Sequence, residues 1–221
     1  MKIILFGATG MVGKGVLRQC LLDPDVESIL SIGRKPSGMS HPKLRDLVRA
    51  DMFDFHLNAE DVNGYDTCFF CLGVSSVGMS AAEYSHLTYD LTIGWAHALA
   101  RQNPAMRFLY VSGTGTGGKA RWAQVKGRTE NELLELFPGA IMIRLGALRP
   151  MHGERSKAPG GGVLLAILSP LWPILQRMFP KSIITTEELG RAMILAARNG
   201  GPNRVLESAD LVALGRLGVK R

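Results

Sequence analysis

The chain has 221 residues, of which 46% are hydrophobic and 20% are charged, so it can bury one sizeable core in a single domain. This composition excludes an intrinsically disordered chain. The formal net charge is +7, but the basic residues are scattered and never form a run of five or six like charges. We therefore expect no nucleic-acid partner.

The cysteines and the N-terminal residues bear on the compartment. Cys68 and Cys71 have the spacing of a redox pair, but they lie in the apolar run DTCFFCLG, which is typical of a buried strand. Residues three apart on a strand point to opposite faces, so the two thiols should diverge and, with Cys20, act as small buried hydrophobes in a reducing compartment. The start MKIILFGATG has too short an apolar run for a signal peptide. The sequence predicts a cytoplasmic protein.

Short apolar runs alternate with longer helical patterns along the chain. This alternation is typical of βαβ units and predicts one doubly wound parallel sheet, an α/β Rossmann fold in a single domain. The predicted strands cover 2–6, 28–32, 47–50, 67–72, 107–112, 140–145 and 204–207, and the predicted helices cover 12–22, 83–102, 122–136 and 186–199.

The region 149–182 is the least regular part of the sequence. From Val163 to Leu175 it has thirteen residues without a charge, fewer than the ~20 that a membrane-spanning helix needs, and it contains Pro170 and Pro173. We therefore expect no transmembrane segment, and a small helical cap on the substrate side of the sheet. The alternative is an interfacial surface, in weak contact with a membrane or in a homodimer.

A glycine-rich stretch, FGATGMVGKG, directly follows the first strand and begins the first helix. Such glycines allow a tight turn, leave room for a pyrophosphate and let the helix pack closely, while free N–H groups of the helix face the phosphates. The alternative is a strand-to-helix turn without a ligand. The predicted dinucleotide-binding residues here are Gly7, Ala8, Thr9, Gly10, Met11, Val12 and Gly13.

The second strand ends in SIGRKPSG, where an NAD enzyme would carry an acid for the ribose 2′-hydroxyl. Arg34 and Lys35 suit a 2′-phosphate instead. The sequence therefore predicts NADP(H) as the preferred cofactor, with NAD(H) as the alternative. A solvated basic loop is the interpretation without a ligand.

Two later strand ends complete the predicted adenosine site. Asp51 follows the third strand, where a carboxylate can accept a hydrogen bond from the adenine amino group, with Met52 against the ring. The fourth strand ends in CLGVSS, and its backbone is expected under the ribose and diphosphate at Leu72, Gly73 and Val74.

The segments GATGMVG, CLG, LYVSG, QVKGRTE, IRLG and TTEELGRAM span the chain and resemble atypical short-chain dehydrogenases/reductases, which include NmrA-like and epimerase-like proteins. In that family a serine after the fifth strand, a tyrosine and a lysine four residues later form the catalytic set. Ser112 and Lys126 match this pattern, but Trp122 stands in place of the tyrosine. The resemblance implies that Lys126 binds the nicotinamide ribose.

The replacement leaves the source of a proton open, because an indole N–H is only a hydrogen-bond donor. Ser112 and the threonines that follow it are poor acids, and Tyr84 and Tyr89 are more typical of packing aromatics. His152 has a suitable side chain for a general acid, or it is a plain loop histidine. Electron-poor acceptors such as quinones and flavins need little acid help. The candidate catalytic residues are Ser112, Lys126 and His152.

Two functions fit these residues. The first is an NADP(H)-dependent reductase that acts on a small carbonyl, quinone or flavin-like acceptor, and needs no metal. The second is a non-enzymatic NADP(H) sensor of the NmrA kind that reports to a protein partner. The tryptophan favours the sensor, whereas Ser112 and Lys126 favour the enzyme.

Overall fold

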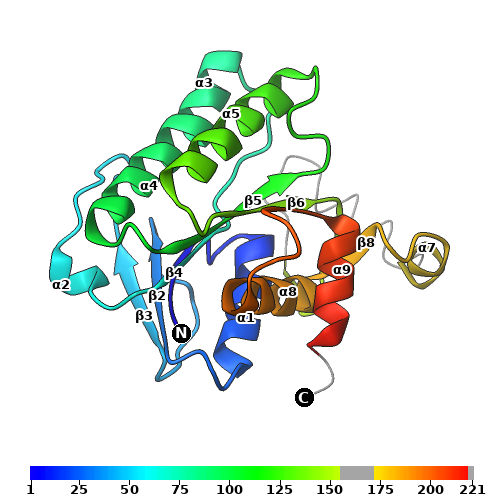
Figure 1. Ribbon diagram of the computed structural model, residues 1–221, viewed down its shortest axis with the longest axis horizontal. Coiled ribbons are helices and arrows are strands. Elements are labelled where there is room, and N and C mark those ends of the chain that lie inside the picture. The colour runs from blue at the N-terminus through cyan, green and yellow to red at the C-terminus, as the bar shows by residue number, and fades with distance from the viewer. Residues whose placement is uncertain (155–171, 219–221) are drawn as a thin grey trace.

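The computed structural model describes residues 1–154 and 172–218, which form a parallel sheet with helices on both faces (Figure 1). The strand order is β3-β2-β1-β4-β5-β6-β9. These strands are β1 (Lys2–Phe6), β2 (Ser28–Gly33), β3 (Leu44–Val48), β4 (Thr67–Phe70), β5 (Arg107–Gly113), β6 (Ile141–Leu145) and β9 (Val205–Glu207).

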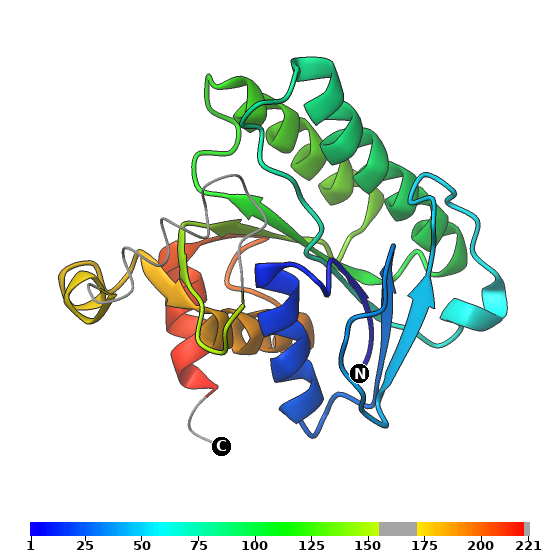
Figure 2. The same ribbon diagram turned by 180° about the vertical axis from the view of Figure 1, so that it is seen from behind.

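One face of the sheet carries α1 (Met11–Leu22), α8 (Thr186–Asn199) and α9 (Ser208–Leu217). The other face carries α5 (Arg121–Leu136) and a continuous helix made of α3 (Ala81–Ser85), the π-helical turn η1 (His86–Asp90) and α4 (Leu91–Gln102). Figure 1 and Figure 2 show these two layers from opposite sides. The short helix α2 (Ala59–Val62) lies near the β3 edge.

The strands form the sheet because they are apolar on both faces. In β1, Ile3 and Leu5 pack into the core under α1 and α8, whereas Ile4 and Phe6 pack into the core under α4 and α5. All four side chains are fully buried. Because each buried aliphatic or aromatic side chain contributes about 1.5–3 kcal/mol, both faces of β1 stabilise the fold.

The prediction of one doubly wound parallel sheet with seven strands is confirmed, with small shifts at the strand ends. β3 covers 44–48 rather than 47–50, because this half-exposed edge strand has no continuous apolar run. β4 ends at Phe70 rather than residue 72, since the chain turns away after the N–H of Cys71 donates to the carbonyl of Phe6 at 3.1 Å. The sequence interpretation missed α9, which begins at a capping box between Glu207 and Asp210.

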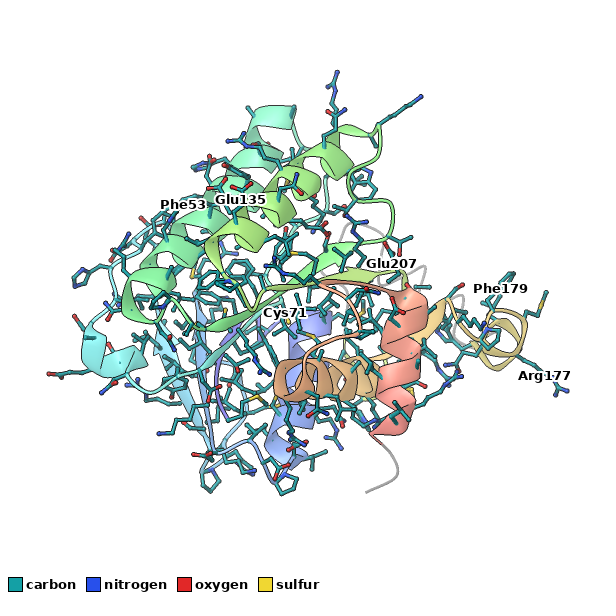
Figure 3. All side chains as sticks on the ribbon, viewed as in Figure 1. Phe53, Cys71, Glu135, Arg177, Phe179 and Glu207 are labelled. Carbon is teal, nitrogen blue, oxygen red and sulfur yellow. The ribbon has the colours of Figure 1, made fainter. Side chains whose placement is uncertain are left out.

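The cysteines behave as the sequence predicts. Cys20 and Cys68 are fully buried in opposite cores, Cys71 packs against the core that holds Cys20, and all three thiols are free. Figure 3 shows Cys71 near the centre of the molecule. Burial raises the pKa of each thiol. A redox pair of Cys68 and Cys71 is excluded, because their side chains lie on opposite faces of the sheet.

Only the two ends of the predicted cap, 149–182, are described, because residues 155–171 lie outside the described residues. At these ends β7 (Ala147–Arg149) pairs in parallel with β8 (Ile183–Thr185), and α7 (Trp172–Met178) lies at the periphery beyond β8 (Figure 1). Within the described ranges, no helix is both long and apolar enough to cross a membrane. The cap itself stays a prediction.

Candidate dinucleotide site

The site lies where the carboxyl ends of β1 and β4 meet. These strands are neighbours in the middle of the sheet, and the chain leaves them toward opposite edges. Such a switch point opens a crevice between the loops that follow the two strands. A Cβ added at Gly7 would lie 2.7 Å from the carbonyl carbon of Cys71, so the two loops are in backbone contact.

The three glycines shape the first of these loops. Gly7 has φ +83°, which favours glycine, and its carbonyl accepts a hydrogen bond from the N–H of Gly10 at 2.9 Å. A Cβ at Gly13 would lie 2.1 Å from the carbonyl oxygen of Gly7, so only glycine allows this approach. Helix α1 then begins at Met11 with no capping side chain at Gly10 and no acid in its first turn. These features suit a pyrophosphate at the helix N-terminus.

The other residues of the fingerprint differ in exposure. Ala8 is buried, Thr9 is exposed, and Met11 and Val12 are partly buried against the core under α1. The loop after β4 continues this wall, with Leu72 partly buried and Gly73 and Val74 exposed. The seven fingerprint residues and the three loop residues therefore lie on the two loops that meet at the β1–β4 switch point.

Arg34 and Lys35 follow β2, next to the fingerprint loop in the sheet order. Both side chains are exposed, and within the part of the chain that the structure describes neither makes an ion pair or hydrogen bond. Two free cations at this strand end are available to an anionic group on the ribose.

Asp51 and Met52 follow β3 at the same edge. Asp51 is exposed, and its Oδ1 accepts a hydrogen bond from the N–H of Phe53 at 2.8 Å, whereas its second oxygen has no hydrogen bond to the described residues. The side chain of Met52 is only 7% exposed and packs into the core, while its carbonyl accepts a hydrogen bond from Trp95 at 2.8 Å. Asp51 is thus more accessible to a ligand than Met52.

The nicotinamide end of the crevice is expected at the end of β5. Here Ser112 and Thr116 are buried, and their hydroxyl oxygens lie 2.7 Å apart. The Thr116 hydroxyl donates to the carbonyl of Gly113 at 2.7 Å, so the Ser112 hydroxyl must donate to Thr116. Ser112 is therefore tied to its own loop.

Trp122 lies in the first turn of α5 and packs on this loop. A Cβ added at Gly113 or Gly115 would lie 3.7 Å or 3.8 Å from its indole ring. The ring is partly exposed, and its N–H makes no hydrogen bond among the described residues. The indole forms a flat apolar wall beside the loop.

Lys126 lies one helical turn after Trp122. Its Nζ is 5.2 Å from the centre of the Tyr110 ring. A Cβ added at the following residue, Gly127, would lie 3.0 Å from the Cα of Gly117 in the same loop, so the helix and the loop are close here. Burial lowers the pKa of Lys126 to about 8, although the carboxylate of Glu130 acts in the opposite direction. The ammonium is held at the loop without an ion pair within the described ranges.

His152 is not brought to this group. Its Nε2 lies 2.5 Å from Oε1 of Glu187 in the first turn of α8, and its N–H donates to Glu154 at 2.8 Å. Glu154 is buried and also accepts from Thr186, whose Cβ lies beside Gly15 of α1. His152 therefore lies on the α1 and α8 side of the sheet, whereas Lys126 lies on the α5 side.

Sequence reasoning missed Tyr110 and the buried pair Glu130–Arg144. Tyr110 is two residues before Ser112, so strand periodicity places both on one face, and this signal was available. Glu130 is 2% exposed and accepts from Arg144 at 2.6 Å. No sequence signal links these two residues, because α5 and β6 meet only in the folded protein.

No family model matches the chain. Curated relatives include "Protein fmp52-2, mitochondrial" of Aspergillus terreus, 25% identical over 96% of both chains. Another is "Protein FMP52, mitochondrial" of Debaryomyces hansenii, 27% identical over 72% of this chain and 71% of the relative. These names specify no activity, cofactor or substrate.

Solved structures show the fold. UDP-glucose 4-epimerase of Thermotoga maritima has a TM-score of 0.70 and 13% identity over 98% of this chain and 82% of its own. WbmF of Bordetella bronchiseptica, in complex with NAD+, has a TM-score of 0.68 and 15% identity over 100% of this chain and 79% of its own. The chain thus shares the Rossmann fold of these two structures, and the predicted fold class is confirmed.

The predicted cytoplasmic location is wrong by this comparison, because several relatives are named as mitochondrial proteins. The prediction was based on free thiols and on the lack of a signal peptide's apolar run. Both features argue against secretion, but neither distinguishes the cytoplasm from another reducing compartment.

Proposed function

We propose that this protein is an NADP(H)-dependent reductase of the atypical short-chain type, acting on a small carbonyl, quinone or flavin-like acceptor. The observation that carries the proposal is the glycine turn and uncapped helix start at the β1–β4 switch point. At the neighbouring strand end lie two exposed cations that make no ion pair with any described residue. The solved complexes with NAD support a nicotinamide dinucleotide as the ligand of this fold.

Each wall of the crevice would bind one part of the cofactor. The turn at Gly7 and the start of α1 would hold the pyrophosphate, Arg34 and Lys35 the 2′-phosphate, and Asp51 the adenine amino group. Lys126 would donate hydrogen bonds to the nicotinamide ribose, and Trp122 would exclude water from the neighbouring pocket. When bound, the reduced nicotinamide supplies a hydride.

Calorimetry with NADPH and NADH tests the proposal. NADPH is expected to bind more tightly, and Arg34→Ala should narrow the difference by about 1–3 kcal/mol, the contribution of a hydrogen bond to a charged group. Arg18→Ala, a change in a basic residue in the middle of α1, is the matched control and should leave the difference unchanged. Equal affinity of the wild type for both cofactors would contradict the NADP(H) preference. If the wild type binds neither cofactor, the proposed function is wrong.

A sensor without catalysis is the second candidate, and Trp122 favours it because the family's proton donor is absent. Such a protein would bind NADPH in the same crevice but would not oxidise it. NADPH oxidation measured with aldehydes, quinones and flavins separates the two candidates.

A further inference from the structure

The two buried hydroxyl groups at the end of β5, those of Ser112 and Thr116, have no proton to give. Ser112 donates to Thr116, and Thr116 donates to the carbonyl of Gly113, so both protons are used within the loop. Releasing either proton to a substrate would leave a buried acceptor without its donor. These hydroxyls therefore cannot replace the family's tyrosine without breaking the loop.

The nearby tyrosines and His152 are also unsuitable. Tyr89 donates its proton to Glu132 and stacks with Arg128, on a part of α5 beyond Lys126. Tyr84 and Tyr110 are buried at 4% and 1% exposure, and burial raises the pKa of both phenols. His152 is bound to Glu187 on the opposite side of the sheet.

Of the candidate proton donors that the sequence named, Lys126 is the one that remains. Its ammonium lies over the ring of Tyr110, beside the loop that holds Ser112 and packs against Trp122, and no carboxylate pairs with it in the described part of the chain. We infer that Lys126 is the proton donor of this site, and that the substrate is a carbonyl compound whose oxygen must be protonated. This inference rests on the proposed reductase function.

The step balances as a carbonyl reduction. The carbonyl carbon gains a hydride from the reduced nicotinamide, while the carbonyl oxygen takes a proton from Nζ of Lys126, whose N–H bond breaks and leaves its electron pair on nitrogen. The products are an alcohol, the oxidised cofactor and a neutral amine. Solvent then returns the proton to Lys126, which is partly exposed.

The surroundings of Lys126 are suited to this cycle. The groups that face it are Glu130 on its own helix and the ring of Tyr110 on β5. The hydroxyl of Tyr110 in turn lies among Tyr84 of α3, Thr92 of α4 and Thr129 of α5. Glu130 is already paired with Arg144. The pKa of Lys126, lowered to about 8 by burial, lets the amine be reprotonated near neutral pH.

The decisive variant is Lys126→Arg, because a guanidinium keeps the charge and the hydrogen bonds but does not lose a proton near neutral pH. NADPH affinity should stay within about fivefold, whereas reduction of nitrobenzaldehyde should fall by about 10²–10⁴, the range of a lost general acid. Reduction of phenanthrenequinone should fall far less, since its hydroquinone anion can take a proton from water. Lys119→Arg, in the exposed loop, is the matched control and should change neither rate.

Two further measurements do not depend on how well arginine fits. Adding methylamine to Lys126→Ala should restore part of the aldehyde reduction, and this rescue should follow the protonated fraction of the amine. In the protein without cofactor, labelling of Lys126 by acetic anhydride, followed by mass spectrometry, should be half-maximal near pH 8.

The outcomes distinguish this inference from the proposed function. If the wild type does not bind NADPH, the proposed function is wrong. NADPH binding with undiminished aldehyde reduction in Lys126→Arg would overturn only the inference. NADPH binding without reduction of either probe would also overturn the inference and would support the sensor.

Discussion

At the scale of single residues, Lys126 combines a charge with a poorly hydrated position. Its ammonium faces an aromatic ring rather than a carboxylate, so the cation–π contact offsets only part of the lost hydration. A lysine kept under these conditions lowers the stability of the fold at neutral pH.

The stability of Lys126→Met tests this cost. Burial lowers the folded-state pKa of Lys126 to about 8 from the ordinary 10.5, so the penalty is fully present below pH 8 and disappears as pH rises past 10.5. At pH 7 the variant should be more stable than the wild type by up to about 3 kcal/mol, at 1.36 kcal/mol per unit. Urea unfolding of the wild type and the variant at pH 7 and at pH 10 measures this difference in stability. An equal difference at the two pH values would contradict the lowered pKa.

The Trp122 indole should act as a wall and not as a proton source. If so, Trp122→Phe keeps an aromatic surface on Gly113 and Gly115 and should lower NADPH-dependent turnover by less than about tenfold, a barrier change under ~1.4 kcal/mol. Steady-state kinetics with a fluorescence check of folding measure this. Complete loss of turnover with intact cofactor binding would show that the indole N–H is an essential donor.

At the scale of secondary-structure elements, the crevice depends on how α1 meets β1. The helix begins directly at the loop, and Gly13 lies against the carbonyl of Gly7. A side chain at position 13 would prevent this close approach of the helix to the end of the strand. This approach fixes the N–H groups of the first turn relative to the crevice.

Gly13→Ala should therefore displace α1 from the loop. A Cβ would lie 2.1 Å from the Gly7 oxygen, and relieving this overlap should cost about 1–3 kcal/mol of stability and weaken NADPH binding more than tenfold. Gly73→Ala is the control for stability, since no atom lies within 4 Å of its added Cβ, and it should change stability by less than about 0.5 kcal/mol. Chemical denaturation measures the stability of both variants, and calorimetry measures NADPH binding by Gly13→Ala. An equal loss of stability in the two variants would contradict this account.

At the scale of the whole molecule, Arg144 joins three segments distant in sequence. It lies on β6, binds Glu130 of α5 at 2.6 Å and contacts Glu207 at the end of β9 at 3.2 Å. Glu130 is almost fully buried, whereas the side chain of Glu207 is about half exposed and contributes less. Arg144 thus links α5 to β9, the last strand of the sheet in the chain.

Arg144→Met should cost about 3–5 kcal/mol, because it leaves the Glu130 carboxylate buried without its partner. The double variant Arg144→Met with Glu130→Leu should recover much of this loss, since neither charge then remains buried. Thermal and urea unfolding of the wild type, the two single variants and the double variant give the four free energies of unfolding of a double-mutant cycle. A double variant no more stable than Arg144→Met alone would show that the pair is not the source of the effect.

The sequence by itself determined the sheet and the glycine turn that follows its first strand. Apolar runs such as 2–6 and 107–112 are local patterns, and a strand buried on both faces needs little other information. The glycines at 7, 10 and 13 are likewise read locally, because a left-handed turn and a close helix approach each require a residue without a side chain. The edge strand β3 was placed less accurately because its pattern is weaker.

Only the tertiary structure decided which candidate catalytic groups meet. Ser112, Lys126 and His152 are all candidates in the sequence, but the fold ties Ser112 to Thr116, sets Lys126 over Tyr110 and places His152 with Glu187 across the sheet. Hydrogen-bond partners and burial depend on contacts between segments far apart in the chain. Such contacts follow from how helices pack on both faces of the sheet, which no local pattern of residues specifies.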